Sequence, residues 1–393
     1  MLNTPFEDWP KFSKEEADAV AAVLRSNRVN YLTGKKGREF ENKFAKWCGA
    51  QYAVALSNGT VALELSLKAL GIGPGDEVIV SPRTFVASIS CIAAVGATPV
   101  FADVDRDSQN ITAETIQPAL SRKSRAIICV HLAGWPCEMD PILKLARKHK
   151  LKVIEDCAQA HGALYKGKPV GSLGHIAAWS FCQDKIMTTG GEGGMVTTNN
   201  KKLWSQIWSL KDHGKSWSAV YEKKHPPGNG FRWVVESFGT NGRLTEMQSA
   251  VGLIQLGRMK EWKQKRQDNV AQILEVCRKF SGLRVPEVPD HVDHAGYRAY
   301  VFARPENLKR GWSRDRIMEQ INALGVPCYV GSCSEVYREK VFEKTGWRPR
   351  KPLPNAKELG ETSLMFLVHP TLRKSDIVKT RKAIEKVLNE ASK

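Results

Sequence analysis

Short runs of apolar residues alternate with amphipathic stretches along the first half of the chain. The amphipathic stretches carry apolar side chains at helical spacing, and they predict helices over residues 60–70, 84–95, 112–120 and 139–150. The apolar runs between them are nearly continuous, as is typical of strands covered on both faces of a sheet. They predict strands over residues 52–56, 77–80, 99–104, 126–130, 152–155, 177–181 and 195–198. Because helical crossovers join parallel strands, we expect an α/β fold with one large, mostly parallel sheet.

The pattern changes near residue 244. Apolar positions at helical spacing begin there and continue through a charged stretch to residue 279, which predicts one long helix. Pro286 and Pro289 then mark turns, followed by an expected strand over 297–303. Helical patterns return over 313–324 and 375–391. We therefore expect a large domain over residues 1–255 and a smaller α+β domain over residues 256–393.

The composition is that of an ordinary globular protein, with 42% hydrophobic and 25% charged residues among 393. No run of 18 apolar residues is present, so no membrane partner is expected. The first residues lack a basic region followed by an apolar core, and we expect a cytoplasmic location. The nine cysteines form no CxxC pair, and seven of the nine histidines, all but His161 and His369, show no metal-ligand spacing, so no metal site is expected.

The net charge of +18 permits two interpretations. A DNA-binding regulatory protein would use such charge on the phosphate backbone, and an enzyme would use it to attract an anionic substrate. The basic residues are spread widely, and we find no helix-turn-helix with basic recognition residues. The sequence therefore favours an enzyme with a substrate such as a diphosphate-bearing small molecule, and no nucleic-acid partner.

Lys185 has the most informative surroundings in the chain. It follows the apolar run 176–181 and precedes a stretch, 190–194, with four glycines in five positions. Upstream, the apolar run 151–154 ends in Glu155 and Asp156. In open parallel sheets, ligands lie beyond the carboxyl ends of the strands. An amine and a carboxylate placed there suit pyridoxal phosphate, whose aldehyde forms a Schiff base with lysine and whose pyridine nitrogen is held protonated by a carboxylate.

Three further features suit such a cofactor, and each has a simpler explanation. Gly59 and Thr60 lie where a strand meets a helix, so their N–H groups could hold a phosphate, or the segment could simply cap the helix. The Ser180 hydroxyl could bind a phosphate oxygen or bond to backbone. Phe85, just after a strand, could stack on a flat ring or belong to the core.

Five segments together resemble one known family. They are SNGTVALELSLKALGIGPGDEVIV, TFVAS, VIEDCAQAHGALYKGKPVGSLGHIAAWSFCQDK, GGEGGMVTTN and NGRLTEMQSAVGLIQL. In this order and at this spacing they are similar to the DegT/DnrJ/StrS family of PLP-dependent nucleotide-sugar aminotransferases. The resemblance runs from about residue 30 to the HPTL segment at 369–372. It implies fold type I of the PLP-dependent transferases, which is like that of aspartate aminotransferase, with a large mixed, mostly parallel sheet domain and a smaller α+β C-terminal domain.

The resemblance also implies a role for each matching residue. The implied cofactor contacts are Lys185 as Schiff-base lysine and proton shuttle, Asp156 at the pyridine nitrogen, Gln159 at the phenolic oxygen, Phe85 on the ring, and Gly59, Thr60 and Ser180 at the phosphate. Asn241 and Arg243 would reach the cofactor phosphate of a partner subunit, which implies a homodimer with shared sites. Arg243, together with Lys35 and with His161 near a motif segment, is also a candidate to bind the substrate.

The implied reaction converts a nucleotide-linked keto sugar of the keto-deoxyhexose type to the aminosugar, for O-antigen or a related polysaccharide. Glutamate is the implied amino donor, and pyridoxamine 5'-phosphate the intermediate cofactor form. An alternative is a sugar dehydratase of the same fold, although those relatives carry histidine in place of the lysine.

The chain departs from the family pattern at two places. Lys35 and Lys36 stand where many relatives have a Gly-Pro pair, and they could grip a diphosphate or be two surface lysines. Gln183 and Asp184 stand where a Pro-Gly pair is frequent before the lysine.

Overall fold

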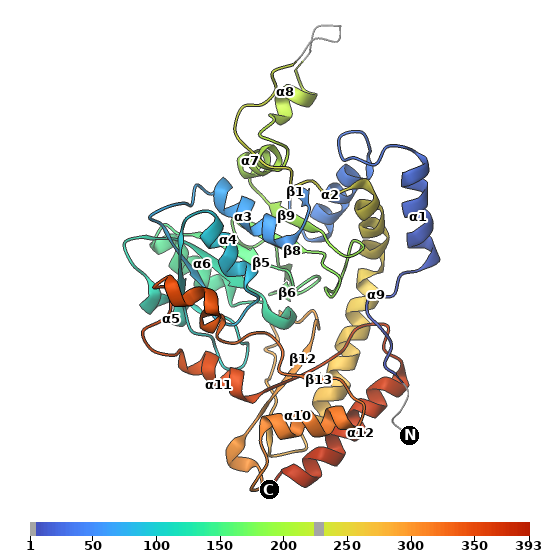
Figure 1. Ribbon diagram of the computed structural model, residues 1–393, viewed down its shortest axis with the longest axis vertical. Coiled ribbons are helices and arrows are strands. Elements are labelled where there is room, and N and C mark those ends of the chain that lie inside the picture. Colours follow the sequence, from blue (N-terminus) through green and yellow to red (C-terminus); the bar gives the residue numbers. More distant parts are fainter. Residues whose placement is uncertain (1–4, 224–231) are drawn as a thin grey trace.

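The computed structural model describes residues 5–223 and 232–393. Its largest element is a seven-stranded sheet in the order β1-β9-β8-β5-β4-β2-β3, of which β1, β9, β8 and β5 are labelled in Figure 1. The strands are β1 (Tyr52–Leu56), β2 (Glu77–Val80), β3 (Thr98–Phe101), β4 (Ser124–Val130), β5 (Lys152–Asp156), β8 (Ile176–Ser180) and β9 (Gly194–Thr198). The pairings among β2, β3, β4, β5 and β8 are parallel, whereas β9 runs antiparallel to β1 and β8. The predicted strands and the mixed, mostly parallel sheet are confirmed.

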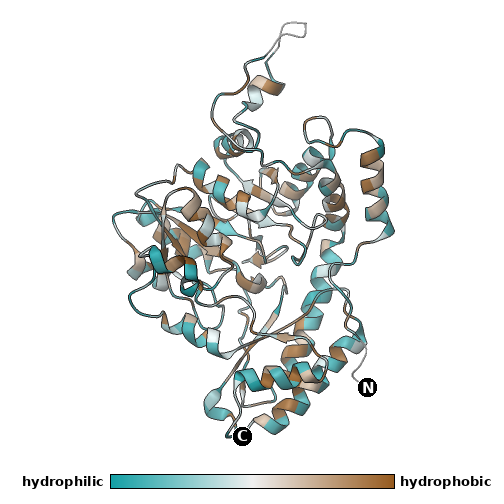
Figure 2. Ribbon diagram, in the orientation of Figure 1, coloured by the Kyte–Doolittle hydropathy of each residue, from teal (hydrophilic) through white to brown (hydrophobic). Residues whose placement is uncertain are grey.

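The strands are continuously apolar because both faces of the sheet are buried. Val78 and Val80 of β2 belong to one core with helix α3 (Gly59–Ala69), whereas Ile79 between them belongs to a second core with α6 (Met139–Lys148). Side chains alternate along a strand, so an apolar residue is needed at every position. Figure 2 shows the same distribution, with hydrophobic residues concentrated in the central strands.

A second, antiparallel sheet lies in the C-terminal part, in the order β10-β12-β14-β13. Its strands are β10 (Leu283–Arg284), β12 (Ala299–Ala303), β13 (Cys328–Tyr329) and β14 (Ser363–Phe366). Helices α10 (Arg314–Ala323) and α12 (Lys374–Ala391) share its apolar core. The predicted helices over 313–324 and 375–391 and the strand over 297–303 are confirmed, with small changes at their ends.

One helix, α9 (Glu246–Cys277), runs from the first sheet to the second (Figure 1). It packs against α1 (Lys14–Arg25), α2 (Lys36–Trp47), α12 and β12. The long helix predicted from residue 244 is therefore confirmed. The domain boundary proposed between residues 255 and 256 falls within α9, so the chain crosses it without a break.

Several elements have no counterpart among the predicted ones. These are α1, α2, α7 (Lys201–Lys211), α8 (Trp217–Tyr221), α11 (Pro354–Thr362), the strands β10, β13 and β14 of the second sheet, and a three-stranded sheet of β6 (Leu164–Tyr165), β7 (Lys168–Pro169) and β11 (Val292–Asp293). The helix predicted over 112–120 is a single turn, α5 (Ala113–Ile116), followed by a 3-10 turn at Gln117–Ala119. Pro118 at the start of that 3-10 turn has no N–H to continue the α-helical bonds.

Candidate functional site

A cavity of about 640 Å³ opens where the ends of β5 and β8 meet the start of α3. Seven of the predicted site residues line it, namely Gly59, Thr60, Phe85, Asp156, Gln159, Ser180 and Lys185. They come from segments far apart in the sequence, and the sheet brings them together because the carboxyl ends of its parallel strands lie at one edge.

Asp156, the last residue of β5, is the buried acid of this cavity. One carboxylate oxygen, Oδ2, accepts a hydrogen bond of 2.9 Å from the Ser88 hydroxyl, and Oδ1 accepts one of 3.1 Å from the Ala158 N–H. Burial raises the pKa of Asp156, and these two hydrogen bonds partly offset that rise. Among the described residues no cation forms a hydrogen bond with this carboxylate, and because it faces a cavity it is suited to receive a cationic group from a ligand.

Ser88 is in turn supported by Thr84, whose hydroxyl oxygen lies 2.9 Å from that of Ser88. Both side chains are buried, and they lie four residues apart where the chain enters α4 (Ala87–Ala94). The roles of these two residues were not predicted from the sequence, although both lie within the TFVAS segment that carries the family resemblance. Their spacing was the available signal, since residues four apart on a helix share a face.

Lys185 lies in the turn after β8, and its side chain is 18% exposed. Its Nζ donates a hydrogen bond of 3.0 Å to Asp184 Oδ1, and its backbone carbonyl accepts one of 2.7 Å from the Trp9 indole. The glycine-rich stretch that follows brings β9 close to the start of α3. A Cβ on Gly194 would lie 2.4 Å from the backbone of Asn58, so no other residue fits there without a shift.

The start of α3 lies against the end of β8. A Cβ on Gly59 would meet the Cβ of Ser180 at 2.8 Å, so glycine permits this approach. The Asn58 side chain caps the helix by accepting the Val61 N–H at 2.9 Å, which confirms the capping interpretation. Capping leaves the N–H groups of Gly59 and Thr60 without helical partners at the cavity, and these groups attract anions.

Two residues form other walls of the cavity. Phe85 is 69% exposed, which excludes the interpretation that it belongs to the core. Gln159 accepts the Ala133 N–H at 2.8 Å through its side-chain oxygen, which leaves its amide nitrogen to donate into the cavity. An exposed aromatic face, a buried carboxylate, an amine and a helix N-terminus fit the ring, pyridine nitrogen, aldehyde and phosphate of PLP.

Four predicted site residues do not line this cavity in the single chain. Lys35 is exposed at the start of α2, and Asn241 is exposed beside Asp212. Arg243 forms an ion pair with Asp212. His161 is fully buried between the rings of Trp179 and Phe181.

The His161 ring is an unusual buried group, because neither of its nitrogens has a hydrogen-bond partner within the described part of the chain. Burial lowers its pKa to about 3, and the nearby Lys185 and Arg266 cations act in the same direction. His161 is therefore a neutral ring behind the cavity wall.

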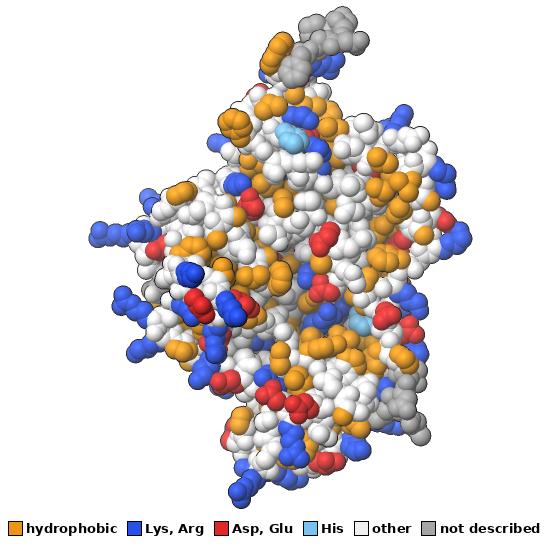
Figure 3. Space-filling view, in the orientation of Figure 1, with side chains coloured by type: hydrophobic (Ala, Val, Ile, Leu, Met, Phe, Trp, Pro, Cys, Tyr) orange, Lys and Arg blue, Asp and Glu red, His pale blue; other side chains and the backbone are white. Residues whose placement is uncertain are grey.

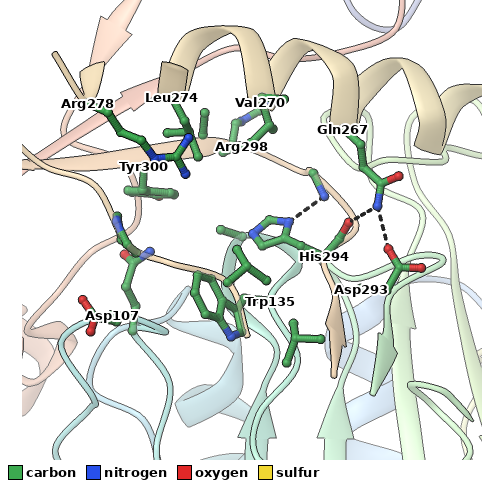
Figure 4. Close-up of a pocket in the computed structure, with 18 residues that line it drawn as sticks. Asp107, Trp135, Gln267, Val270, Leu274, Arg278, Asp293, His294, Arg298 and Tyr300 are labelled. Carbon is green, nitrogen blue, oxygen red and sulfur yellow. Dashed lines mark hydrogen bonds between the residues drawn. The ribbon is translucent and has the colours of Figure 1, made fainter. Parts of the chain in front are cut away.

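A second cavity, of about 330 Å³, lies between α9, β12 and the loop that follows β4 (Figure 4). Trp135, His294 and Arg298 are among its lining residues. On one side, the Gln267 side chain donates to Asp293 at 2.6 Å and to the His294 carbonyl at 2.9 Å. The predicted site residues do not line this cavity.

His131, Glu155 and Cys157 form the one group, among the described residues, with metal-ligand atoms close together. His131 Nε2 lies 3.0 Å from Glu155, and its Nδ1 accepts the Cys137 N–H at 3.0 Å. Glu155 also accepts the Gly171 N–H at 2.9 Å. Both histidine nitrogens are thus engaged, and a hydrogen-bond network that holds the loop before β8 explains the group.

On the face shown in Figure 3, basic and acidic side chains are interspersed over the surface. A protein that binds along nucleic acid is expected to gather its basic residues in one stripe. The excess of basic residues does not form such a stripe on that face. Among the described residues, no helix combines the length and apolar character needed to cross a membrane.

This chain is similar to known proteins along nearly its whole length. The sequence profile of the DegT/DnrJ/EryC1/StrS aminotransferase family matches residues 10–385. GDP-perosamine synthase of Caulobacter vibrioides is 35% identical over 382 residues, which cover 96% of this chain and 97% of that protein. The X-ray structure of the aminotransferase from Psychrobacter cryohalolentis is 58% identical with a TM-score of 0.96, and the match covers 98% of this chain and 99% of that one.

The X-ray structure of DesV from S. venezuelae, in complex with a ketimine intermediate, is 31% identical with a TM-score of 0.83 and covers 95% of this chain and 94% of that chain. These matches confirm the resemblance, the fold class and the PLP dependence inferred from the sequence, and they favour an enzyme over a DNA-binding regulator. The chain belongs to the DegT/DnrJ/EryC1/StrS aminotransferase family and is a PLP-dependent aminotransferase of fold type I.

Proposed function

We propose that this enzyme transfers an amino group from glutamate to a nucleotide-linked keto sugar of the keto-deoxyhexose type, and that it does so as a homodimer with shared sites. The observation that carries the proposal is the meeting of Lys185, Asp156 and the N-terminus of α3 around one cavity. When bound there, PLP supplies an electron sink for the bonds around the amine-bearing carbon.

Asp156 would hold the pyridine nitrogen of the cofactor. Its carboxylate is buried and has no cation in hydrogen-bond contact within the described chain, so a protonated ring nitrogen would satisfy its charge. Phe85 would stack on the ring and the Gln159 amide would donate to the phenolic oxygen. The phosphate would bind Gly59, Thr60 and Ser180, whose hydroxyl accepts the Cys182 N–H at 3.3 Å and keeps its own proton to donate.

Lys185 would anchor the cofactor covalently and, once released, carry a proton to and from the substrate carbon. Lys185 lines the cavity together with Ser180 and Asp184. An amine held beside the reacting carbon acts as general base at high effective concentration. A lysine at this position also favours the aminotransferase over the sugar dehydratase, in whose relatives histidine replaces it.

The names of the relatives support the class of substrate. GDP-perosamine synthase, a match along nearly the whole chain, is named for a nucleotide-linked aminosugar. The chain has 59 basic and 41 acidic residues, and the resulting positive charge would attract an anionic diphosphate. Lys35 and Lys36, exposed at the start of α2, are the candidates in this chain for contact with that diphosphate.

The shared-site homodimer is supported by the segment that carries Asn241. That residue is exposed and lies outside the cavity of its own chain, as expected of a group that serves a partner. Val235 and Phe238 of the same segment are 56% and 101% exposed. Apolar side chains so exposed next to a polar candidate residue favour a covering second subunit.

The decisive experiment is reduction of the holoenzyme with borohydride followed by peptide mapping. We expect one pyridoxyl adduct, at Lys185, and loss of visible absorbance in Lys185→Ala but not in Lys201→Ala, an exposed lysine of α7. An adduct at another lysine, or none, would refute the proposed role of Lys185.

The substrate class is tested separately, with a panel of nucleotide-linked keto sugars and glutamate, followed by mass spectrometry. Aminosugar product is expected, whereas a deoxysugar would identify the dehydratase. If no member of the panel reacted while the adduct at Lys185 formed, the substrate class would be wrong and the cofactor site right.

A further inference from the structure

Asp184 occupies a position that gives Lys185 a carboxylate partner within its own turn. Its Oδ1 lies 3.0 Å from Lys185 Nζ, and this is the ion pair that Lys185 makes among the described residues. The second oxygen, Oδ2, accepts a short hydrogen bond from the Tyr297 hydroxyl. Asp184 also stands at one of the two places where the sequence departs from the pattern frequent in the family.

Tyr297 holds the carboxylate from the C-terminal part of the chain. It lies two residues before β12, is 5% exposed, and its N–H donates to the Ala133 carbonyl at 3.1 Å. A buried, anchored tyrosine fixes Oδ2, so the other oxygen is directed at Lys185 without free rotation of the carboxylate. The pair thus differs from an ordinary surface contact between sequence neighbours, which has no such third group.

The Tyr297 ring also places a second cation near this pair. Lys185 Nζ lies 5.7 Å from the centroid of the ring, and Arg298 Cζ lies 4.4 Å from it. Without Asp184, two positive groups would face one ring with no anion between them. The carboxylate therefore balances charge at a crowded point where the two parts of the chain meet.

The net effect on the amine follows from these contacts. Burial lowers the pKa of Lys185, whereas a charge on Tyr297 and the Asp184 carboxylate raise it. Burial raises the pKa of Tyr297 itself and keeps its hydroxyl neutral, which leaves the Asp184 carboxylate as the charge that acts. The other titratable or charged groups around Lys185 are Asp156, His161, Cys182, Glu192, Arg266 and Arg298.

We propose that Asp184, fixed by Tyr297, is a positioning residue that holds the free ammonium of Lys185, and that this ion pair must open each time the lysine joins the cofactor. The inference rests on the proposed role of Lys185. For the bond to form, the ammonium gives up one proton to solvent, the neutral amine adds to the aldehyde carbon, and water leaves as the C=N bond is made. Asp184 thereby stabilises the ion-paired ammonium of Lys185 relative to the neutral amine that reacts with the aldehyde.

The test is the pH dependence of cofactor capture. Apoprotein is mixed with PLP between pH 6 and 9, and the visible absorbance of the bound cofactor is followed in time. Removing the charge in Asp184→Asn or Asp184→Ser should move the profile to lower pH, with capture at pH 7 about two- to fivefold faster. Asp184→Glu, which retains the charge, should keep the profile close to that of the parent enzyme.

A matched control is Asp315→Asn. Asp315, like Asp184, pairs with a basic neighbour in sequence, in this case the preceding Arg314 at 2.7 Å, but it lies in α10 and does not line the cavity. It should leave the profile unchanged. Two charge-removing variants guard against loss of folding in one of them.

The possible outcomes distinguish a failure of the role proposed for Asp184 from a failure of the role proposed for Lys185. If the parent enzyme forms the adduct at Lys185 and neither charge-removing variant shifts the profile, the role of Asp184 is wrong and that of Lys185 stands. If the control shifts as much as Asp184→Asn, a general charge effect replaces the proposed one. If the parent enzyme captures no PLP at Lys185, the proposed function fails, and the inference falls with it.

Discussion

Replacing Ser88 by alanine should weaken cofactor binding without disturbing the fold. The Ser88 hydroxyl donates to Asp156 at 2.9 Å in a fully buried setting, and it is the one side-chain donor to that carboxylate among the described residues. A hydrogen bond to a charged group contributes about 1.5–3 kcal/mol. Because about 1.4 kcal/mol corresponds to a factor of ten, PLP should bind about 10- to 150-fold more weakly.

The direction of the effect follows from the pKa of Asp156. Burial raises that pKa and Ser88 opposes the rise, so Ser88→Ala makes the carboxylate still harder to ionise. A less anionic Asp156 attracts the protonated ring nitrogen less, and the loss should be greatest at the lower end of the pH range. The buried Thr84 hydroxyl, 2.9 Å from Ser88, also loses its partner in the variant.

The assay is titration of apoprotein with PLP, followed by absorbance and by quenching of tryptophan fluorescence. Ser66→Ala provides the control, since Ser66 is equally buried but donates to the Ala62 carbonyl of its own helix at 2.6 Å. It should leave the dissociation constant for PLP within a factor of two. Equal affinity for Ser88→Ala and the parent protein would refute the view that Ser88 tunes Asp156.

Two substitutions and a change of pH should alter stability in different directions. In the parent protein the buried Lys211 ammonium lies 2.8 Å from the Glu41 carboxylate. Glu41→Gln removes this counter-ion and should lower the free energy of unfolding, measured in urea, by about 3–5 kcal/mol. Adding Lys211→Met should restore most of that loss. Asp156→Asn should abolish PLP binding yet raise the melting temperature of the apoprotein at pH 7 by about 1–3 °C. Burial raises the pKa of Asp156, so its ionisation at neutral pH destabilises the folded apoprotein, and asparagine removes that cost. A lower melting temperature would contradict this. Burial lowers the pKa of His161 and His369 to about 3 and that of His294 to about 4. Stability should therefore be full above about pH 6.5 and fall toward acid by up to about 4 kcal/mol per pH unit. A flat profile from pH 7 to pH 4.5 would show that these rings do not stay neutral.

The strands of the large sheet were predictable because burial on both faces leaves a continuous apolar signal, as in Val78, Ile79 and Val80. Elements with a narrower buried stripe were missed. In α2 the fully buried contacts include Phe40 and Phe44, one turn apart in a segment rich in charge. The two-residue strands β6, β7 and β11 are too short to have a periodicity at all.

The candidate site divides in a similar way. Lys185 and Asp156 could be located because each follows an apolar strand, and the topology of parallel sheets places such ends together. Contacts made by the tertiary structure left no local pattern. Tyr297 meets Asp184 across 113 positions in the sequence, and nothing in either segment indicates the other.

The continuity of α9 limits how this enzyme can close around its substrates. Its 32 residues span about 48 Å as one rod, and no proline interrupts it. A continuous helix resists bending at its middle, so the two sheets are joined by a stiff element at this border. A movement of one sheet relative to the other would tilt α9 as a whole. The tilt would reach Trp9, whose ring faces Arg266 of that helix and whose indole N–H donates to the backbone carbonyl of Lys185.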